Sequence, residues 1–221
     1  MTIKVTTTMR STHWVKMLCY GESGIGKTVM SATAPRPIII SAEQGLLSLA
    51  ERDMPVIEVT TLEEVKQAYA FLKDSDDYDT ICIDSISELA EKLLVEFKKE
   101  TKDPRKAYGR IGDEMSEIIR KFRDIPNKHV YMIAKQARLK DEYTGKITHI
   151  PSMPGQQLPM SLPYLFDLVV CMRIGKVDKK EYRYLQTQPT PLYEAKDRSG
   201  KLNEKEEPNL TKLFDKVRGT K

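Results

Sequence analysis

The sequence Gly21-Glu22-Ser23-Gly24-Ile25-Gly26-Lys27-Thr28 lies between an apolar run, Val15–Tyr20, and a segment with a helical pattern. Glycine adopts backbone conformations that other residues avoid, so this G-x-x-x-x-G-K-T pattern lets successive N–H groups turn inward around phosphate oxygens. We expect a helix to begin at Lys27 and to end before Pro35, with its positive N-terminal end facing the same anion. The pattern therefore predicts a phosphate-binding loop between a buried strand and a helix.

Two side chains at the end of this loop have expected tasks in nucleotide chemistry. Lys27 would reach the β- and γ-phosphates of a nucleotide, and the Thr28 hydroxyl would be one ligand of Mg²⁺. The loop by itself indicates either ATP or GTP together with Mg²⁺. We predict ATP and Mg²⁺ as the cofactors.

Short apolar runs alternate with longer helical patterns, which is typical of a sheet covered by helices. The runs that we interpret as strands after the loop are Pro37–Ala42, Val56–Val59, Thr80–Asp84 and His129–Ala134. Helical spacing is found in Leu62–Leu72, in Ile86–Lys99 and around Met115–Phe122. The segment Lys98–Arg110 contains Pro104 and Gly109, so we expect a loop there. The fold class is α/β, with a largely parallel central sheet and helices on both faces.

The C-terminal part of the chain is richer in strand patterns. A turn-rich stretch, Asp141–Gly155, contains Tyr143-Thr144-Gly145-Lys146, which suggests the tip of a hairpin. Further predicted elements are the strands Leu168–Met172, Tyr182–Gln186 and Pro191–Ala195 and a short helix over Asn209–Val217. We therefore expect an antiparallel, strand-rich end. The predicted units are an N-terminal arm at residues 1–14, a core at 15–200 and a charged tail at 201–221.

Three polar side chains follow predicted strands, at the sheet edge where the phosphate loop lies. Asp84 ends an apolar strand and would hold Mg²⁺ mostly through water. Glu43 follows the second strand, where a carboxylate can polarise a water molecule for attack on the γ-phosphate. The Gln136 amide can donate to the γ-phosphate and so report hydrolysis. The alternatives are a helix cap at Asp84, which Ser85 could provide instead, a solvated acid at Glu43 and a surface glutamine.

Composition narrows the class of protein. The formal net charge of +4 permits a nucleic-acid partner without arguing for one. Cys19, Cys82 and Cys171 each lie in an apolar run and are too scattered for a metal site, so we expect buried, reduced thiols. No apolar stretch approaches the roughly 20 residues that span a bilayer. We expect a cytoplasmic protein with no membrane partner.

The order of these motifs resembles that of the RecA-like recombinase ATPases. The features that carry the resemblance are the phosphate loop, Glu43, Ile83-Asp84-Ser85-Ile86-Ser87-Glu88-Leu89 as a Walker B segment, and Lys135-Gln136-Ala137-Arg138. The chain looks most like minimal phage members of this group, which act in single-strand annealing and recombination. The resemblance covers roughly residues 16–200. It implies ATP hydrolysis, self-association into a ring or filament, and the host cytoplasm if the protein is phage-encoded.

The resemblance also implies contacts with single-stranded DNA and, as a further partner, a single-strand-binding protein. In that family two loops contact the DNA, and here they would fall at Lys102–Gly112 and from Gln136 through Pro151–Pro163. Six basic residues and two acidic ones lie between positions 98 and 110. Basic residues follow phosphates, and an aromatic ring can stack on a base. The candidate DNA-binding residues are Lys102, Arg105, Lys106, Tyr108, Arg110, Arg138 and Lys140.

The stretch Lys196-Asp197-Arg198-Ser199-Gly200 resembles the Lys-x-Arg finger of related ring and filament ATPases. In those proteins the finger reaches the γ-phosphate of a neighbouring subunit and stabilises transition-state charge. By resemblance, Lys196 and Arg198 would act on the ATP of the next subunit. The alternative is an ordinary basic turn.

Two further function classes fit the phosphate loop. A small-molecule kinase would need an acceptor pocket and an arginine-bearing lid, for which the 98–110 segment is a candidate. A non-catalytic module would use ATP only as a switch for partner docking. A ring-type DNA motor is a variant of the leading hypothesis, because it uses the same finger. DNA-stimulated ATP hydrolysis separates the recombination hypothesis from the first two.

Overall fold

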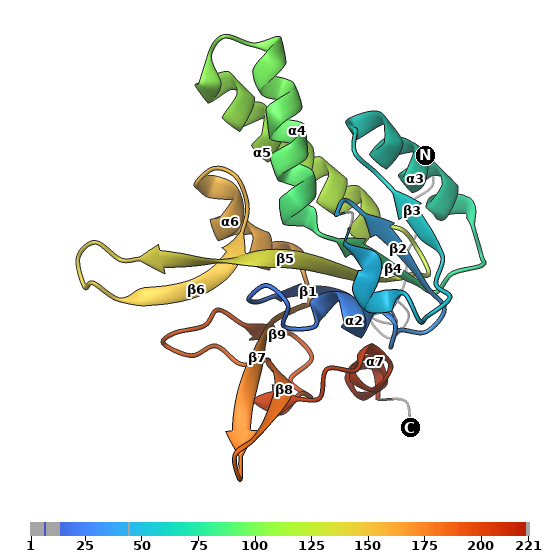
Figure 1. Ribbon diagram of the computed structural model, residues 1–221, viewed down its shortest axis with the longest axis vertical. Coiled ribbons are helices and arrows are strands. Elements are labelled where there is room, and N and C mark those ends of the chain that lie inside the picture. The colour runs from blue at the N-terminus through green and yellow to red at the C-terminus, as the bar shows by residue number, and fades with distance from the viewer. Residues whose placement is uncertain (1–6, 8–13, 44, 220–221) are drawn as a thin grey trace.

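The computed structural model describes residue 7, residues 14–43 and residues 45–219. Its parallel strands are β1 (Lys16–Tyr20), β2 (Pro37–Ser41), β3 (Val56–Glu58), β4 (Thr80–Asp84), β5 (His129–Lys140) and β7 (Leu168–Val177). They lie in the order β7-β1-β5-β4-β2-β3 (Figure 1). The predicted arm at residues 1–14 lies outside the described residues, apart from Thr7 and Trp14.

Antiparallel strands extend the β7 side of the sheet. They are β8 (Lys180–Gln186), β9 (Lys196–Asp197) and β10 (Lys205–Glu206), while β6 (Ile147–Ser152) pairs with β5. Strands β8 and β9 both pair with β7, and β10 pairs with β8. The hairpin with its tip at Tyr143–Lys146 is confirmed, and so is the α/β class with an antiparallel C-terminal end.

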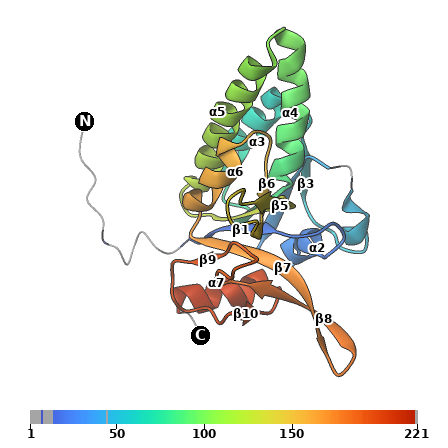
Figure 2. The same cartoon turned by 90° about the vertical axis from the view of Figure 1, so that its left-hand side faces the viewer.

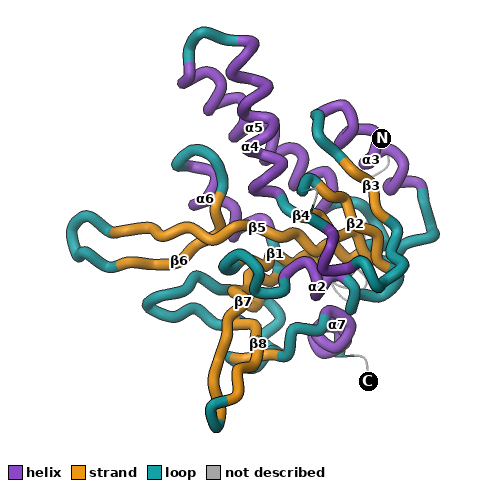
Figure 3. The backbone as a smooth tube through the Cα atoms, in the orientation of Figure 1, coloured by secondary structure: helices purple, strands orange, loops and turns teal. Residues whose placement is uncertain are grey.

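Helices cover both faces of the sheet (Figures 2 and 3). One face carries α3 (Leu62–Asp74), α4 (Ile86–Glu100), α5 (Pro104–Arg123), α6 (Gln157–Ser161) and the 3₁₀ turn η2 (Leu162–Leu165). The other face carries α2 (Lys27–Ser31), the 3₁₀ turn η1 (Leu46–Leu49) and α7 (Leu210–Arg218). None of the described helices combines the length and the apolar character that a bilayer crossing requires.

The apolar runs of the sequence become central strands because the sheet is buried on both sides. Successive side chains of a strand point to opposite faces. In β1, Leu18 and Tyr20 therefore pack in the core beneath α3, α4 and α5, whereas Met17 and Cys19 pack in the core beneath α2 and α7. The cysteines at 19, 82 and 171 are all buried and free, as the apolar runs predicted.

The prediction of a loop over Lys98–Arg110 is wrong. Helix α4 continues to Glu100, and only residues 101–103 connect it to α5, which begins at Pro104. Proline is tolerated at the first helical position because the N–H that it lacks would have no partner within the helix. The Asp103 side chain accepts a hydrogen bond of 2.9 Å from Arg105 N and caps this end. The sequence signal taken as a break is therefore the start of a helix.

Two strand predictions also need correction. Strand β5 does not end at Ala134 but continues to Lys140, because its second half pairs with β6 outside the main sheet. The segment Pro191–Ala195 forms no strand, and only Tyr193 makes an isolated bridge, to His149. The Tyr20 hydroxyl shares its one hydrogen between the His149 and Glu194 carbonyls, at 2.9 and 2.7 Å, so the end of β1 holds both segments together.

Candidate nucleotide-binding site

The phosphate-binding loop joins the end of β1 to the start of α2. Gly24 and Gly26 have φ values of 70° and 111°, in the left-handed region that side chains with a Cβ rarely adopt. The loop lines a cavity of about 560 Å³, a volume within the usual range for a small-molecule ligand. The glycines of the sequence pattern are thus required by the backbone path around this cavity.

Lys27 curls back over its own loop. Its ammonium donates hydrogen bonds to the carbonyl oxygens of Gly21 at 2.8 Å and of Glu22 at 2.7 Å. Burial lowers the pKa of Lys27, while the nearby Cys19, Asp84 and Glu43 oppose that shift. The ammonium is thus held next to the loop. Phosphate oxygens bound there could accept hydrogen bonds both from it and from the loop N–H groups.

Thr28 and Asp84 meet across the site. The Thr28 hydroxyl donates to Asp84 Oδ2 at 2.5 Å, and Asp84 is only 4% exposed at the end of β4. Burial raises the pKa of Asp84 to about 6, against the opposing effect of the Thr28 hydrogen bond. Hydroxyl and carboxylate oxygens are the ligand type that Mg²⁺ prefers, and here they come from α2 and from the end of β4. The residues therefore fit Mg²⁺, with Thr28 and Asp84 as the groups that would hold it.

Glu43 lies beside this pair at the same sheet edge. Strand β2 pairs with β4 in parallel, so its end is adjacent to Asp84. The Ser85 hydroxyl donates to Glu43 Oε1 at 2.7 Å and accepts from Glu88 N at 3.1 Å, so Ser85 caps α4 and orients the carboxylate. Glu43, Asp84 and Ser85 line the same cavity as the phosphate loop.

Gln136 enters the cavity from β5. Its Oε1 accepts a hydrogen bond of 3.6 Å from the Cys171 thiol, and its side chain is half-buried. Arg138, two positions along the same strand, also lines the cavity. The sequence assigned Arg138 to DNA, whereas the structure brings it to the nucleotide side.

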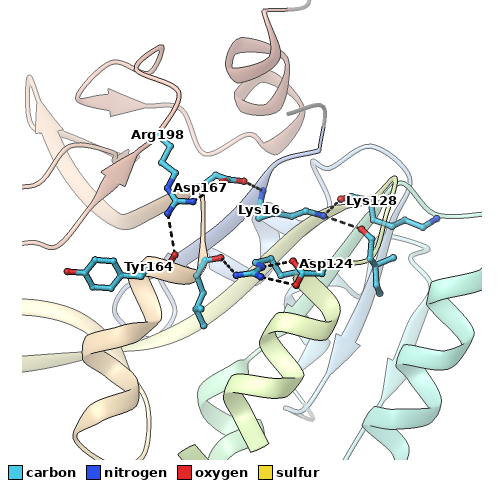
Figure 4. Close-up of polar contacts among 9 residues, drawn as sticks. Lys16, Asp124, Lys128, Tyr164, Asp167 and Arg198 are labelled. Atoms are coloured by element: carbon cyan, nitrogen blue, oxygen red, sulfur yellow. Dashed lines mark hydrogen bonds and ion pairs between the residues drawn. The ribbon is translucent and has the colours of Figure 1, made fainter. Parts of the chain in front are cut away.

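Lys196 and Arg198 lie elsewhere. Strand β9 pairs with the beginning of β7, at Leu168, whereas the phosphate loop follows the opposite end of the parallel sheet. Lys196 Nζ donates to the Pro163 carbonyl at 2.5 Å. Figure 4 shows Arg198 against Asp167 and the Tyr164 carbonyl, each at 3.4 Å. Neither residue lines the nucleotide cavity of its own chain.

The candidate DNA-binding residues on α5 have different surroundings. Arg105 and Tyr108 line a second cavity, of about 1,020 Å³, between α5 and residues 154–158 and 161. Lys102 and Lys106 are exposed, as is Lys140 on the β5–β6 hairpin, but none of the three lines this cavity. Arg110 is engaged, because its guanidinium lies 3.8 Å from the centre of the Phe97 ring and pairs with Glu100.

Sequence reasoning missed two contacts of the site. Ser85 was considered only as a helix cap, although its position after Asp84 at the shared sheet edge was the available signal. Arg183 on β8 donates through Nε to the Ile25 carbonyl at 2.7 Å. Nothing in the local pattern around Arg183 indicates this contact, because the two residues are 158 positions apart.

The chain was compared with curated proteins, with solved structures and with models of protein families. A search of curated proteins gives no match. Among solved structures, a KaiC-like protein from the hyperthermophilic archaeon Pyrococcus horikoshii OT3 is similar, with 12% identity over 77% of this chain and 76% of that one and a TM-score of 0.43. The family described as AAA domain matches residues 13–199. The chain therefore belongs to the AAA domain family and is a P-loop ATPase.

Proposed function

We propose that this ATPase is a single-stranded-DNA-binding recombination and annealing protein that assembles head to tail, with ATP bound between subunits. The observation that carries the proposal is the second cavity, where Arg105 and Tyr108 of α5 face residues 154–158. These are parts of the two segments that the resemblance assigns to DNA. A cationic side chain and an aromatic ring in one cavity suit a phosphate backbone with unstacked bases.

Hydrolysis would use the groups gathered around the first cavity. The loop N–H groups and Lys27 would hold the phosphates, and Mg²⁺ on Thr28 and Asp84 would neutralise charge on the β- and γ-oxygens. The Glu43 carboxylate would accept a proton from the attacking water. The water oxygen would bond to the γ-phosphorus while the bond between the γ-phosphorus and the β–γ bridging oxygen breaks. Ser85 would keep Glu43 oriented through its 2.7 Å hydrogen bond.

Polar contacts join the strand that carries Gln136 to the end of β6, which precedes the segment at the second cavity. The Ser87 hydroxyl donates to the Ser152 carbonyl at 2.6 Å and accepts from Lys135 N at 2.9 Å, which fixes the start of α4 to both β5 and β6. Lys135 Nζ pairs with Glu88 and Glu91 at 2.6 and 2.7 Å. Gln136 follows Lys135 on β5. We therefore expect that gaining or losing a contact between Gln136 and the γ-phosphate would shift the segment that faces Arg105.

The position of the finger residues supports the proposed head-to-tail assembly. Lys196 and Arg198 cannot serve their own phosphate loop, because they lie at the opposite end of the parallel sheet. Arg198 is 55% exposed, so a neighbouring subunit could meet it. An assembly in which this end of one subunit faces the phosphate loop of the next would make ATP hydrolysis depend on association.

The test is ATPase activity with and without single-stranded DNA, together with fluorescence anisotropy on a labelled oligonucleotide. We expect the wild type to bind DNA and to hydrolyse ATP faster in its presence. The double variant R105E/K106E should lose about tenfold or more in DNA affinity, with a smaller salt dependence, and keep its DNA-independent ATPase rate. The matched control is R120E/K121E, which makes the same change of charge at two exposed sites in the last turn of α5.

Three outcomes would contradict the proposal. One is a wild-type ATPase rate that DNA leaves unchanged across low-salt conditions, with no retention of DNA. Another is an equal loss of DNA affinity in R120E/K121E and R105E/K106E, which would reduce the effect to general charge. The third is phosphoryl transfer to a nucleoside or nucleotide by a monomer, which would establish the kinase alternative.

A further inference from the structure

The C-terminal β7–β8 hairpin touches the phosphate-binding loop from behind. Strand β7 pairs in parallel with β1, which leads into the loop, and β8 returns antiparallel beside β7. From β8, Arg183 Nε donates a hydrogen bond of 2.7 Å to the Ile25 carbonyl. Arg183 does not line the nucleotide cavity, so it contacts the loop from outside that cavity.

The fit between Arg183 and the loop is close. A Cβ built on Gly26 would lie 3.4 Å from both Cδ and Nε of Arg183, so the arginine stem packs against the loop backbone at this glycine. The Ile25 side chain is buried in the core beneath α2 and α7. The peptide between Ile25 and Gly26 is therefore held by apolar packing and by the guanidinium.

The orientation of this peptide matters for phosphate binding. In such a loop the N–H groups point inward at the anion, so the carbonyls turn outward and need partners elsewhere. Arg183 supplies a charged donor to one of these carbonyls, and hydrogen bonds of this kind are stronger than neutral ones. The same guanidinium adds positive charge directly behind a loop that must hold a polyphosphate.

We infer that Arg183 is a positioning residue for the phosphate-binding loop, through which the β7–β8 hairpin sets the affinity for the nucleotide. The inference rests on nucleotide binding at residues 21–28 and not on DNA binding or assembly. Arg183 acts on the ground state and the transition state alike, because the loop holds the phosphates throughout the reaction. Its loss therefore raises KM and the dissociation constant of ATP and leaves kcat nearly unchanged.

The test compares three variants for binding of a fluorescent ATP analogue and for steady-state ATPase activity without DNA. R183M removes the donor and the charge but keeps an unbranched stem, and we expect its Kd and KM to rise about tenfold, which corresponds to about 1.4 kcal/mol. R183K keeps the charge and should lose about threefold. K180M, on the exposed start of the same strand, is the matched control for charge and should bind as the wild type does.

The measurements separate this inference from a purely structural role and from failure of the proposed function. Thermal unfolding of the nucleotide-free R183M protein should match that of the wild type, and kcat should change less than about twofold. An unchanged Kd in R183M, or an equal rise in K180M, would overturn the inference. A wild-type protein that binds the analogue normally but ignores DNA would contradict only the proposed function.

Discussion

The Ser85 hydroxyl donates a hydrogen bond of 2.7 Å to Glu43 Oε1, joining the residue after Asp84 to the carboxylate that follows the neighbouring strand. Ser85 is 2% exposed, so water competes little for this bond. A carboxylate that must orient a water molecule gains from being fixed before the substrate arrives. The pair therefore gives the proposed general base a defined direction.

Replacing Ser85 by alanine tests that relationship. We expect S85A to lower kcat by about tenfold with little change in KM, because Glu43 keeps its charge but loses its orientation. E43Q should lower kcat by about 100-fold or more, to a rate that is still measurable, and still bind ATP. The double variant S85A/E43Q should be no slower than E43Q alone, since residues that act as a unit are not additive.

Ser85 also caps α4, so stability has to be measured alongside activity. Loss of the hydrogen bond from Glu88 N should lower the free energy of unfolding by about 1 kcal/mol. S85T keeps a hydroxyl and is the matched control, with near-normal stability and activity. A proportional loss of kcat in both S85A and S85A/E43Q, each relative to its parent, would refute the positioning role.

Asp84 is expected to make nucleotide binding depend on magnesium. In D84N the carboxylate beside Thr28 becomes a neutral amide of the same shape, so Mg²⁺ loses its charged ligand. A bound divalent ion supplies several kcal/mol of charge stabilisation, so kcat should fall about 100-fold or more. Titration of an ATP analogue with and without Mg²⁺ checks this. T28S, which retains the hydroxyl, should keep the magnesium dependence, and the same dependence in D84N would contradict the assignment.

The Tyr20 hydroxyl ties the end of β1 to two segments far along the chain. Tyr20 is fully buried, and its hydroxyl contacts the carbonyls of His149 and Glu194. Y20F leaves both acceptors without this donor, so we expect a loss of about 1–2 kcal/mol in the free energy of unfolding by urea. Y143F, at a fully exposed tyrosine on the hairpin tip, should cost nothing measurable. Equal stability of Y20F and the wild type would show that this contact does not stabilise the fold.

The parallel half of the fold could be predicted because its central strands are buried on both faces and therefore appear as uninterrupted apolar runs. The meeting of Glu43, Asp84 and Gln136 at one cavity follows from the rule that parallel strands end at a common edge. The start of α5 could not be read in the same way. Pro104 and Gly109 look like breaks, but burial of the apolar face of α5, including Ala107 and Ile111, outweighs the cost of its two helical glycines, roughly 1 kcal/mol each.

The missed contacts of the site have a different cause. Arg183 and Ile25 approach each other only because β8 folds back along β7, so their contact depends on tertiary structure that local pattern does not encode. The fate of Arg110 is similar, since its stacking on Phe97 depends on how α4 and α5 cross. Sequence could select the basic segment but not decide which of its side chains remain available.

The buried Lys16 is expected to make the free energy of unfolding rise at alkaline pH. Burial lowers the pKa of Lys16 to about 8. Asp167 and Asp124 oppose this shift, and Arg123 adds to it slightly. The Lys16 Nζ donates a hydrogen bond of 2.6 Å to the Lys128 carbonyl (Figure 4). Between pH 8 and the unfolded pKa of 10.5 the unfolded chain binds more protons, so the free energy of unfolding rises with pH. The rise from this one group is at most about 3 kcal/mol.

The measurement is urea unfolding from pH 7 to pH 10.5 for the wild type and K16M. Other groups titrate in the same range, so the informative quantity is the difference between the two proteins. We expect the wild type to gain stability relative to K16M as the pH rises. A constant difference across the range would show that Lys16 keeps an ordinary pKa in the folded protein.

Arg198 can be tested as a group that acts on a neighbouring subunit by mixing two inactive proteins. Its contact with Asp167 is a long, exposed ion pair, which holds it only weakly and leaves it free to reach another chain. K27A keeps the finger but loses the phosphate site, whereas R198A keeps the site and should be about 1,000-fold slower. In an equal mixture about one interface in four joins an intact finger to an intact site, so activity should recover toward roughly a quarter of the wild type. The control is R198A mixed with K27A/R198A, which contains no intact finger and should stay inactive. A mixture of K27A and R198A that is no faster than the sum of its parts would mean that Arg198 serves its own chain or none.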